Sequence, residues 1–230
     1  MELNYQRLQH QITGMDEAYI ESYNKNKGIS HQYLIHNKIK PCPFEGDLEQ
    51  VVVLILLANP MYSHSSSSET DHVISNLQRG WGIFSLAPSS NEGIRNWWIQ
   101  HLAALQEHTG LSWRELSNKV AAVQVHTWAS SRFDECFKPP SLSLSQEIAI
   151  AFARRARLII CGRRRTYWQH VMRDPSLAAK MVYLKSVRRP YVSPGNLPPG
   201  AFPNVCTELG APIGQDSEKA TTRLEPQARV

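Results

Sequence analysis

Continuous apolar runs along the chain alternate with longer segments in which apolar residues recur at helical spacing. The first two runs, Val51–Ala58 and Val120–Val125, are typical of strands that other elements cover on both faces. Two shorter runs, Leu158–Cys161 and Met181–Lys185, indicate a third and a fourth strand. Four strands of this kind predict a central sheet rather than a bundle of helices.

Segments with helical spacing separate these strands. They are Ile94–His108, Leu111–Asn118, Ser145–Arg157 and Arg165–Arg173. Strands that alternate with helices are typical of α/β proteins, in which helices cover both faces of a parallel sheet. We therefore expect a three-layer α/β sandwich with a mostly parallel four-stranded central sheet.

The two ends of the chain differ from its middle. Residues 1–48 are polar, and we interpret them as an N-terminal helical extension. Residues 49–202 hold all four predicted strands and form the expected α/β domain. Residues 203–230 lack periodicity and large apolar side chains, so we predict a mobile tail there.

The composition excludes several classes of protein. Apolar residues make up 42% of the chain and charged residues 20%, as in soluble globular proteins. No apolar run reaches the roughly 18 residues that span a bilayer, and the first residues, MELNYQRLQHQ, lack the pattern of a secretion signal. The four cysteines lie far apart without a C-x-x-C pair, which fits a reducing compartment. We expect a cytoplasmic monomer with no membrane partner.

Common cofactor and metal motifs are missing from the sequence. It contains neither G-x-x-x-x-G-K-[ST] nor G-x-G-x-x-G, so no nucleotide-binding loop is indicated. It also lacks the G-x-S-x-G elbow of serine hydrolases. The nine histidines are scattered, and none has ligand spacing beside a cluster of acids. We expect no cofactor and no metal.

Positive charge is concentrated in one part of the chain. Residues 151–200 contain eleven Lys and Arg but a single acid, Asp174, whereas the other parts carry a small negative charge. Arginine binds phosphate oxygens in pairs through its planar guanidinium, so this block predicts a basic face for nucleic acid. A solvated helix face is the alternative, because charge alone does not identify a partner.

Distinctive polar residues follow three of the predicted strands. They are Asn59-Pro60 after the first strand, Gln124 to His126 at the end of the second, and Tyr191 to Asn196 after the last. Ligands of parallel α/β sheets bind beyond the carboxyl ends of the strands. We therefore expect these three segments to converge on one site.

Taken in order, five segments resemble the motifs of the uracil-DNA glycosylase superfamily. They are LLANPMYS (56–63), Gly82–Leu86, VQVHTWAS (123–130), ARLIICG (156–162) and the Tyr191–Asn196 loop, which is similar to the family's His-Pro-Ser-Pro loop. The resemblance covers about residues 48–200. It implies a fold like that of a uracil-DNA glycosylase and hydrolysis of the N-glycosidic bond of a flipped base in DNA, without a metal.

The resemblance assigns roles to individual residues. Asn59 would position the attacking water, and Phe84 would stack on the flipped base. Tyr191 stands where the family often has a His that stabilises the anionic base. Ser193 and the backbone amides of Gly195 and Asn196 would grip a phosphate.

The same resemblance implies contacts to the duplex. Leu197, or the following Pro198 and Pro199, would wedge into the space that the flipped nucleotide leaves. The serine-rich segment 63–70 would add hydrogen bonds to phosphate. The basic face that binds duplex or single-stranded DNA would include Arg163, Arg164, Arg165, Arg188 and Arg189.

Three positions depart from the family pattern. Met61 stands where the most uracil-selective branch has a Tyr, Tyr191 replaces the His, and Gln124, with His126 as a rival, stands where an Asn reads the base. These departures imply a modified pyrimidine, such as a hypermodified phage base, and hence a role in antiviral defence. Two other readings stay open: a DNA-binding module without catalysis, and a small-molecule α/β enzyme.

Overall fold

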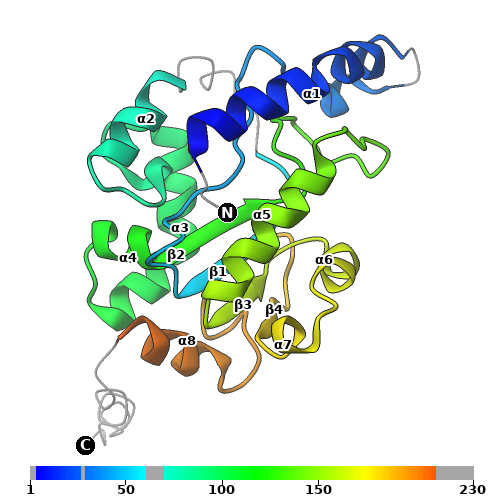
Figure 1. Ribbon diagram of the computed structural model, residues 1–230. Coiled ribbons are helices and arrows are strands. Elements are labelled where there is room, and N and C mark those ends of the chain that lie inside the picture. Colours follow the sequence, from blue (N-terminus) through cyan, green and yellow to red (C-terminus); the bar gives the residue numbers. More distant parts are fainter. Residues whose placement is uncertain (1–3, 27–28, 61–69, 211–230) are drawn as a thin grey trace, which may run out of the picture.

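The computed structural model of the protein describes residues 4–26, 29–60 and 70–210 (Figure 1). Its centre is a sheet of four parallel strands in the order β2-β1-β3-β4. The strands are β1 (Val53–Leu57), β2 (Val120–Gln124), β3 (Leu158–Cys161) and β4 (Met181–Tyr183). Each matches one of the four apolar runs, so the predicted α/β class and four-stranded sheet are confirmed, and every strand pair is parallel.

Helices cover both faces of this sheet, which gives three layers (Figure 1). Every residue of β1 is buried, and its successive side chains join two different apolar clusters. Leu54 and Leu56 pack with helices α1, α5 and α6, whereas Val53, Ile55 and Leu57 pack with α3, α4 and α8. The described helices are α1 (Tyr5–Lys25), α2 (Thr70–Gln78), α3 (Glu92–Thr109), α4 (Trp113–Lys119), α5 (Leu142–Arg155), α6 (Arg165–Val171), α7 (Pro175–Ala178) and α8 (Ala201–Leu209), with short 3-10 helices at His31–Tyr33 and Phe84–Leu86.

Local sequence explains where the helices beside the site begin and end. The Asn91 side chain accepts hydrogen bonds from the first amides of α3, and Gly110 ends that helix with a left-handed φ of 66°. Ser112 and Glu115 form a capping box at the start of α4. The chain then passes from α4 into β2 without a loop, because the last residue of α4 directly precedes Val120.

The N-terminal helix is part of the main core. Leu8, Ile12 and Ile20 of α1 are buried in the same cluster as the α5 side chains. The buried carboxylate of Asp16 accepts hydrogen bonds from Trp128 Nε1 at 2.8 Å and from the amide of Ser141 at 2.9 Å. These contacts make residues 5–25 a wall of the α/β unit rather than a separate extension.

The mobile tail predicted for residues 203–230 overlaps a helix of the structure. Residues up to Leu209 form α8, in which Val205 and Leu209 are completely buried. Pro203 concealed this helix in the sequence, although proline is tolerated in a first turn, where the amides have no helical partner. Gly210 then ends α8 in a left-handed conformation. The remainder of the predicted tail, 211–230, lies outside the described residues, as do Met61 and residues 63–69 of the serine-rich segment.

The Asp16 hydrogen bonds provide a test of the role of α1. Asp16→Ala leaves the indole of Trp128 and the amide of Ser141 buried without an acceptor, which costs about 3 kcal/mol of unfolding free energy. Urea denaturation followed by tryptophan fluorescence measures the loss. Glu17→Ala, an exposed neighbour on the same helix, is the control and should change stability by less than about 0.5 kcal/mol. Equal stabilities of the two variants would contradict the anchoring role.

Candidate functional site

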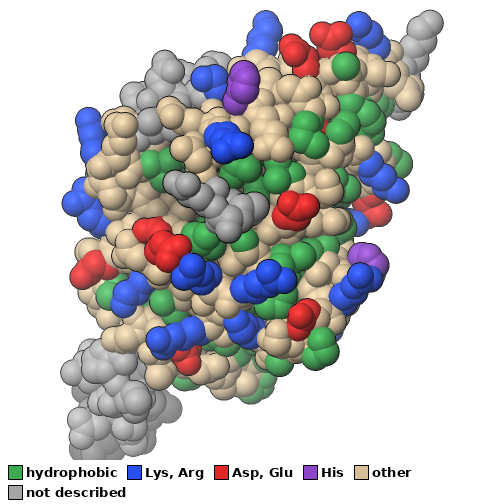
Figure 2. Space-filling view, in the orientation of Figure 1, with side chains coloured by type: hydrophobic (Ala, Val, Ile, Leu, Met, Phe, Trp, Pro, Cys, Tyr) green, Lys and Arg blue, Asp and Glu red, His purple; other side chains and the backbone are tan. Residues whose placement is uncertain are grey.

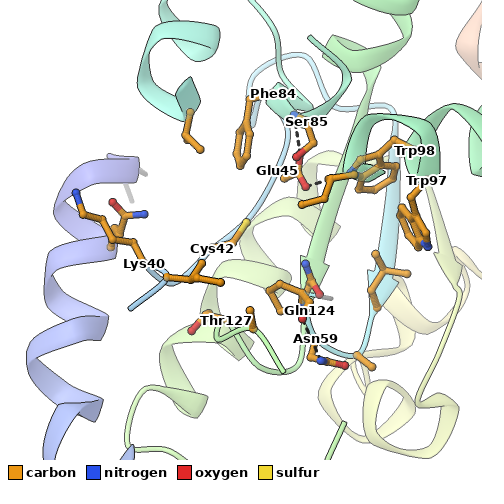
Figure 3. Close-up of a pocket in the computed structure, with 18 of the residues that line it drawn as sticks. Lys40, Cys42, Glu45, Asn59, Phe84, Ser85, Trp97, Trp98, Gln124 and Thr127 are labelled. Atoms are coloured by element: carbon orange, nitrogen blue, oxygen red, sulfur yellow. Dashed lines mark hydrogen bonds between the residues drawn. The ribbon is translucent and has the colours of Figure 1, made fainter. Parts of the chain in front are cut away.

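A cavity of about 150 Å³ lies where β1 and β2 end (Figure 3). A cavity of that size in another protein holds a benzene ring, so the pocket has room for one aromatic ring. The end of a parallel sheet is also where ligands of α/β proteins bind. Its walls come from α1, the segment before β1, the strand ends, the Phe84–Leu86 turn and α3.

Four residues predicted from the sequence line this cavity. They are Asn59, Phe84, Gln124 and Arg163. Asn59 and Gln124 come together because β1 and β2 are neighbours in register, with Leu57 opposite Gln124. Phe84 approaches from the short 3-10 helix between α2 and α3. The convergence of the first two strand ends is therefore confirmed.

The side chain of Asn59 is held in a defined orientation. Its Nδ2 donates to the hydroxyl of Ser130 at 3.0 Å, to the carbonyl of Ser130 at 3.1 Å and to the carbonyl of Pro60 at 3.1 Å. Its Oδ1 makes no hydrogen bond to any residue that the structure describes. Asn59 therefore offers an oriented acceptor to a water or ligand at the pocket.

Phe84 forms one wall of the pocket in a fixed position. Tyr5 of α1 packs edge-on against its ring, with centroids 5.5 Å apart and an interplanar angle of 81°. Its carbonyl accepts hydrogen bonds from Ser90 Oγ at 2.6 Å and Asn76 Nδ2 at 3.3 Å. Figure 3 shows the ring at the edge of the cavity, where it can border a planar ligand.

Two polar atoms at the pocket are buried without a hydrogen-bond partner among the described residues. They are Oε1 of Gln124 and Oγ1 of Thr127. An unpaired buried polar atom costs about 1–3 kcal/mol, so native structures seldom retain one without a reason.

Glu45 is the residue at this site that the sequence did not reveal. Its buried Oε1 accepts from Trp98 Nε1 at 3.2 Å, and its Oε2 accepts from the amide of Ser85 at 3.2 Å (Figure 3). Burial raises the pKa of Glu45 to about 7, and the hydrogen bonds from Ser85 and Trp98 oppose that rise. A lone Glu in a polar segment gives no motif, so only the tertiary structure could identify it.

Backbone contacts bring Glu45 to the sheet. Its amide donates to the carbonyl of Ala122 at 2.9 Å, and the amide of Ala122 donates back at 2.7 Å. The next residue, Gly46, has a φ of 126°, and a Cβ there would lie 2.4 Å from the Cβ of Ala121. Only glycine allows this close approach, which places Glu45 beside β2.

A stack of aromatic rings lies behind the wall on the α3 side, to which Trp97 belongs. Trp97 stacks on the His101 ring with centroids 3.7 Å apart, and the Tyr191 ring meets His101 in a T-shaped contact with centroids 4.8 Å apart. Burial lowers the pKa of His101 to about 4, so its ring is neutral at pH 7. Tyr191 thus supports His101 and is not among the residues that line the cavity, in contrast to its predicted contact with a base.

Two further predicted residues have structural roles. His126 is buried, stacks on Phe133 with ring centroids 4.5 Å apart and does not line the cavity. Of the two candidates for reading the base, Gln124 is therefore the one that lies at the pocket. Leu197 is completely buried in the apolar cluster under α3, so it cannot wedge into a duplex as predicted. An apolar residue after a turn serves equally as a wedge or as core, and the sequence could not separate the two.

The loop before α8 is closed by its own hydrogen bonds. Asn196 Nδ2 donates to the carbonyls of Tyr191 at 2.9 Å and Arg189 at 3.0 Å, and the Asn196 amide donates to the carbonyl of Ser193. The amide of Asn196 is therefore not available for the predicted phosphate contact. The Ser193 hydroxyl makes no hydrogen bond within the described residues, and Gly195 lies at the turn itself.

The fold divides the basic block of residues 151–200 between the two ends of the parallel strands. Arg157 directly precedes β3 and Arg163 follows it, so the arginines on either side of this strand lie at opposite ends. At the amino end of β3, Arg155 pairs with Glu49 and Arg157 pairs with Glu208. Figure 2 shows basic and acidic side chains mixed over the lower half of the face. The block of residues 151–200 is therefore divided, and the arginines predicted to bind DNA, Arg163 to Arg165, Arg188 and Arg189, all follow the carboxyl ends of β3 and β4.

The arginines at the carboxyl ends of β3 and β4 have different surroundings. Arg163 is half-buried, burial lowers its pKa, and its Nε has no partner among the described residues. Arg164 has a left-handed φ of 59°, pairs with Glu135 and lies over the Phe133 ring. Arg165 is exposed and lies 4.1 Å over the ring of Tyr183, and Arg188 and Arg189 are exposed.

Comparison with family models, with curated proteins and with solved structures gives no match for this chain. Within residues 4–26, 29–60 and 70–210, no helix is long and apolar enough to cross a membrane. The same residues contain no group of three or more His, Cys, Asp or Glu placed to hold a metal ion.

The raised pKa of Glu45 predicts a pH-dependent stability. Folded Glu45 keeps its proton up to a pH of about 7, whereas the unfolded side chain loses it near 4.5, so unfolding is increasingly favoured between these values. Glu45 should lower the free energy of unfolding by up to about 3 kcal/mol between pH 4.5 and pH 8. Urea denaturation across this range, compared with Glu45→Gln, isolates the effect from that of the histidines.

The Glu45→Gln difference must itself change with pH, because a constant loss of packing would give a constant difference. Glu107→Gln, at an exposed position of α3, is the control and should follow the wild-type curve at every pH. A difference between wild type and Glu45→Gln that stays flat from pH 4.5 to pH 8 would contradict the raised pKa.

Proposed function

We propose that this protein is a DNA glycosylase that hydrolyses the N-glycosidic bond of a flipped pyrimidine. The observation that carries the proposal is a ring-sized cavity that gathers Asn59, Phe84 and Gln124 at the carboxyl ends of β1 and β2. The resemblance in sequence independently assigns these residues to water positioning, base stacking and base reading. Their convergence supports the assignment.

The pocket offers the groups that this hydrolysis needs. The ring of Phe84 borders the base, and the amide of Gln124 can donate to and accept from its polar edge. The Oδ1 of Asn59, which makes no hydrogen bond to a described residue, accepts a hydrogen bond from the attacking water and holds it beside the sugar. A neutral amide is a weak base, so Asn59 contributes by placement rather than by removing a proton.

Bond cleavage leaves an electron pair on the base and develops positive charge on the sugar. The attacking water bonds to the anomeric carbon and releases its proton as the base departs. Arg163 lines the cavity with a guanidinium, which can stabilise the negative charge on the departing base. It thus supplies the electrostatic role that the sequence had assigned to Tyr191.

We assign recognition of the DNA phosphate backbone to the carboxyl ends of the strands. Lys185, Arg188 and Arg189 are exposed there, beside the loop that holds Ser193. A flipped nucleotide entering the cavity would carry its phosphates past this edge. The departures at Met61 and Tyr191 favour a modified pyrimidine, and a defence role against phages that carry such bases is part of this proposal.

A second candidate function is an enzyme that acts on a small molecule with an aromatic ring. The pairing of Arg155, Arg157 and Arg164 with acids favours this candidate, because paired arginines neutralise fewer phosphates. The two candidates differ in salt dependence, since only binding to DNA should weaken steeply and linearly in the logarithm of salt concentration.

Asn59→Ala tests the catalytic assignment. Because Oδ1 of Asn59 is the acceptor that places the water, the variant should lose base release by about a hundredfold or more, with duplex affinity within a few-fold. Single-turnover assays on oligonucleotides containing a panel of 5-substituted pyrimidines measure the rate. Asn204→Ala, on the exposed side of α8, is the control and should retain the wild-type rate. Wild-type rates in the Asn59 variant would rule out its role.

A pair of double charge reversals tests the DNA-binding edge. Arg188→Glu with Arg189→Glu should weaken binding to every DNA sequence and lower the salt slope of log K by about 2, because phosphate contacts position without specifying. Arg154→Glu with Arg157→Glu makes the same change in net charge at the amino edge and should have a much smaller effect. Fluorescence anisotropy at several salt concentrations measures both. Equal losses from the two edges would reject the assignment.

A further inference from the structure

Three acceptor atoms surround the amide nitrogen of Asn59, which lies at the end of β1 on the wall of the cavity (Figure 3). Its Nδ2 lies 3.0 Å from the hydroxyl oxygen of Ser130, 3.1 Å from the Ser130 carbonyl and 3.1 Å from the Pro60 carbonyl. The two carbonyls can only accept hydrogen bonds, because they have no hydrogen to donate. The function proposed above assigns the attacking water to Asn59, and this inference rests on that function.

The hydroxyl of Ser130 can donate or accept, and a second contact decides between the two. It donates its hydrogen to the carbonyl of Arg132 at 2.8 Å. A hydroxyl has a single hydrogen, so the Ser130 oxygen can only accept from Asn59. Ser130 is 2% exposed, and its amide donates to the Pro60 carbonyl at 3.3 Å, which ties this segment to the end of β1.

We call these three oxygens, the hydroxyl and carbonyl of Ser130 and the carbonyl of Pro60, the acceptor cage. The cage fits a nitrogen that carries two hydrogens, and it opposes an oxygen in the same place because lone pairs would then face lone pairs. A reversed amide would set Oδ1 of Asn59 against all three acceptors and remove their donor. The amide is therefore confined to the orientation in which Oδ1 is turned away from the cage.

This orientation matters for the attack of water on the sugar. A water that donates to Oδ1 of Asn59 keeps its lone pairs available, and one of them can form the bond to the anomeric carbon. As that bond forms, the glycosidic electron pair leaves with the base, and the water releases a proton to solvent. A water that accepts from an amide N–H has committed a lone pair, so the reversed amide would hold it unproductively.

We propose that Ser130 is a positioning residue that, together with the Pro60 carbonyl, keeps the Asn59 amide in the orientation that presents Oδ1 to the water. Ser130 is not among the residues that line the cavity, so it acts through Asn59 and not on the base. The acceptor cage also makes position 59 selective: an amide fits it, and an ionised carboxylate of the same shape does not.

Asn59→Asp tests the acceptor cage, because it replaces the amide nitrogen by oxygen without changing the shape of the side chain. A protonated carboxyl still donates to the cage and keeps a free acceptor, whereas an ionised one sets an oxygen against it. The rate of base release, divided by the wild-type rate, should therefore fall at least about tenfold between about pH 5.5 and about pH 8.5. A ratio that stays flat or rises with pH would overturn the cage.

The other titratable groups near Asn59 are common to both proteins. They are Tyr5, Lys40, Cys42, Glu45 and Arg163 in the cavity walls, with His126 and Arg132 in the segment of Ser130. The cations Lys40 and Arg163 favour a carboxylate, so a fall with pH reflects the acceptor cage acting against them. Asn204→Asp makes the same replacement at an exposed position of α8 and should match the wild-type rate at every pH.

A double-mutant cycle distinguishes positioning by Ser130 from general damage to the fold. Ser130→Ala leaves two carbonyls in the cage, so it should lower base release by about three- to tenfold, with duplex affinity within about twofold. In the Asn59→Ala background the same change should cost less than about twofold, because Ser130 acts through Asn59. Ser131→Ala, at an exposed neighbour, should keep the wild-type rate. Equal losses in both backgrounds, or no loss in either, would overturn the positioning role.

Solvent exchange of side-chain amide hydrogens separates this inference from the proposed function, because it needs no catalysis. The Asn59 amide signals, identified by NMR from their loss in Asn59→Ala, should exchange at least about tenfold more slowly than those of exposed Asn204. Slow exchange without base release from any oligonucleotide supports the acceptor cage and overturns the glycosylase proposal. Base release with exchange as fast as that of Asn204 overturns the cage and leaves the glycosylase proposal standing.

Discussion

The pair of backbone hydrogen bonds between Glu45 and Ala122 determines the shape of the site. It holds the segment before β1 against β2, which is one of the two outer strands of the sheet, and so pairs backbone groups of β2 that would otherwise be exposed. The absence of a side chain at Gly46 permits the contact. Once the segment is fixed, the Glu45 carboxylate can reach Trp98 and Ser85, and α3 and the Phe84 turn close around the same cavity.

The parts of this structure that the sequence could predict are those with a local signature. Continuous apolar runs identified the strands, since a strand covered on both faces has no polar side. Asn59 and Gln124 were found because polar residues at strand ends meet at one edge of a parallel sheet. Glu45 had no such signature, because its partners Ser85, Trp98 and Ala122 are brought to it only by the tertiary fold.

The charge pattern shows the limit of reasoning along the chain. Arginines that are close in sequence were expected to form one face, but β3 passes through the middle of the block and carries its two halves to opposite edges. Arg155 and Arg157 then meet acids that are remote in sequence, at Glu49 and Glu208. Charged residues that flank a strand in the sequence lie at opposite ends of that strand and so do not share one surface patch.

The anchor of α1 has a consequence for how the protein is made. Asp16 bonds to Ser141, which lies 125 positions further along the chain, and Tyr5 packs on Phe84. During synthesis the first helix emerges from the ribosome well before these partners exist, and its apolar stripe of Leu8, Ile12 and Ile20 has nothing to cover it. Contacts this distant slow folding, so the stripe on the nascent helix stays exposed until the later partners have been made.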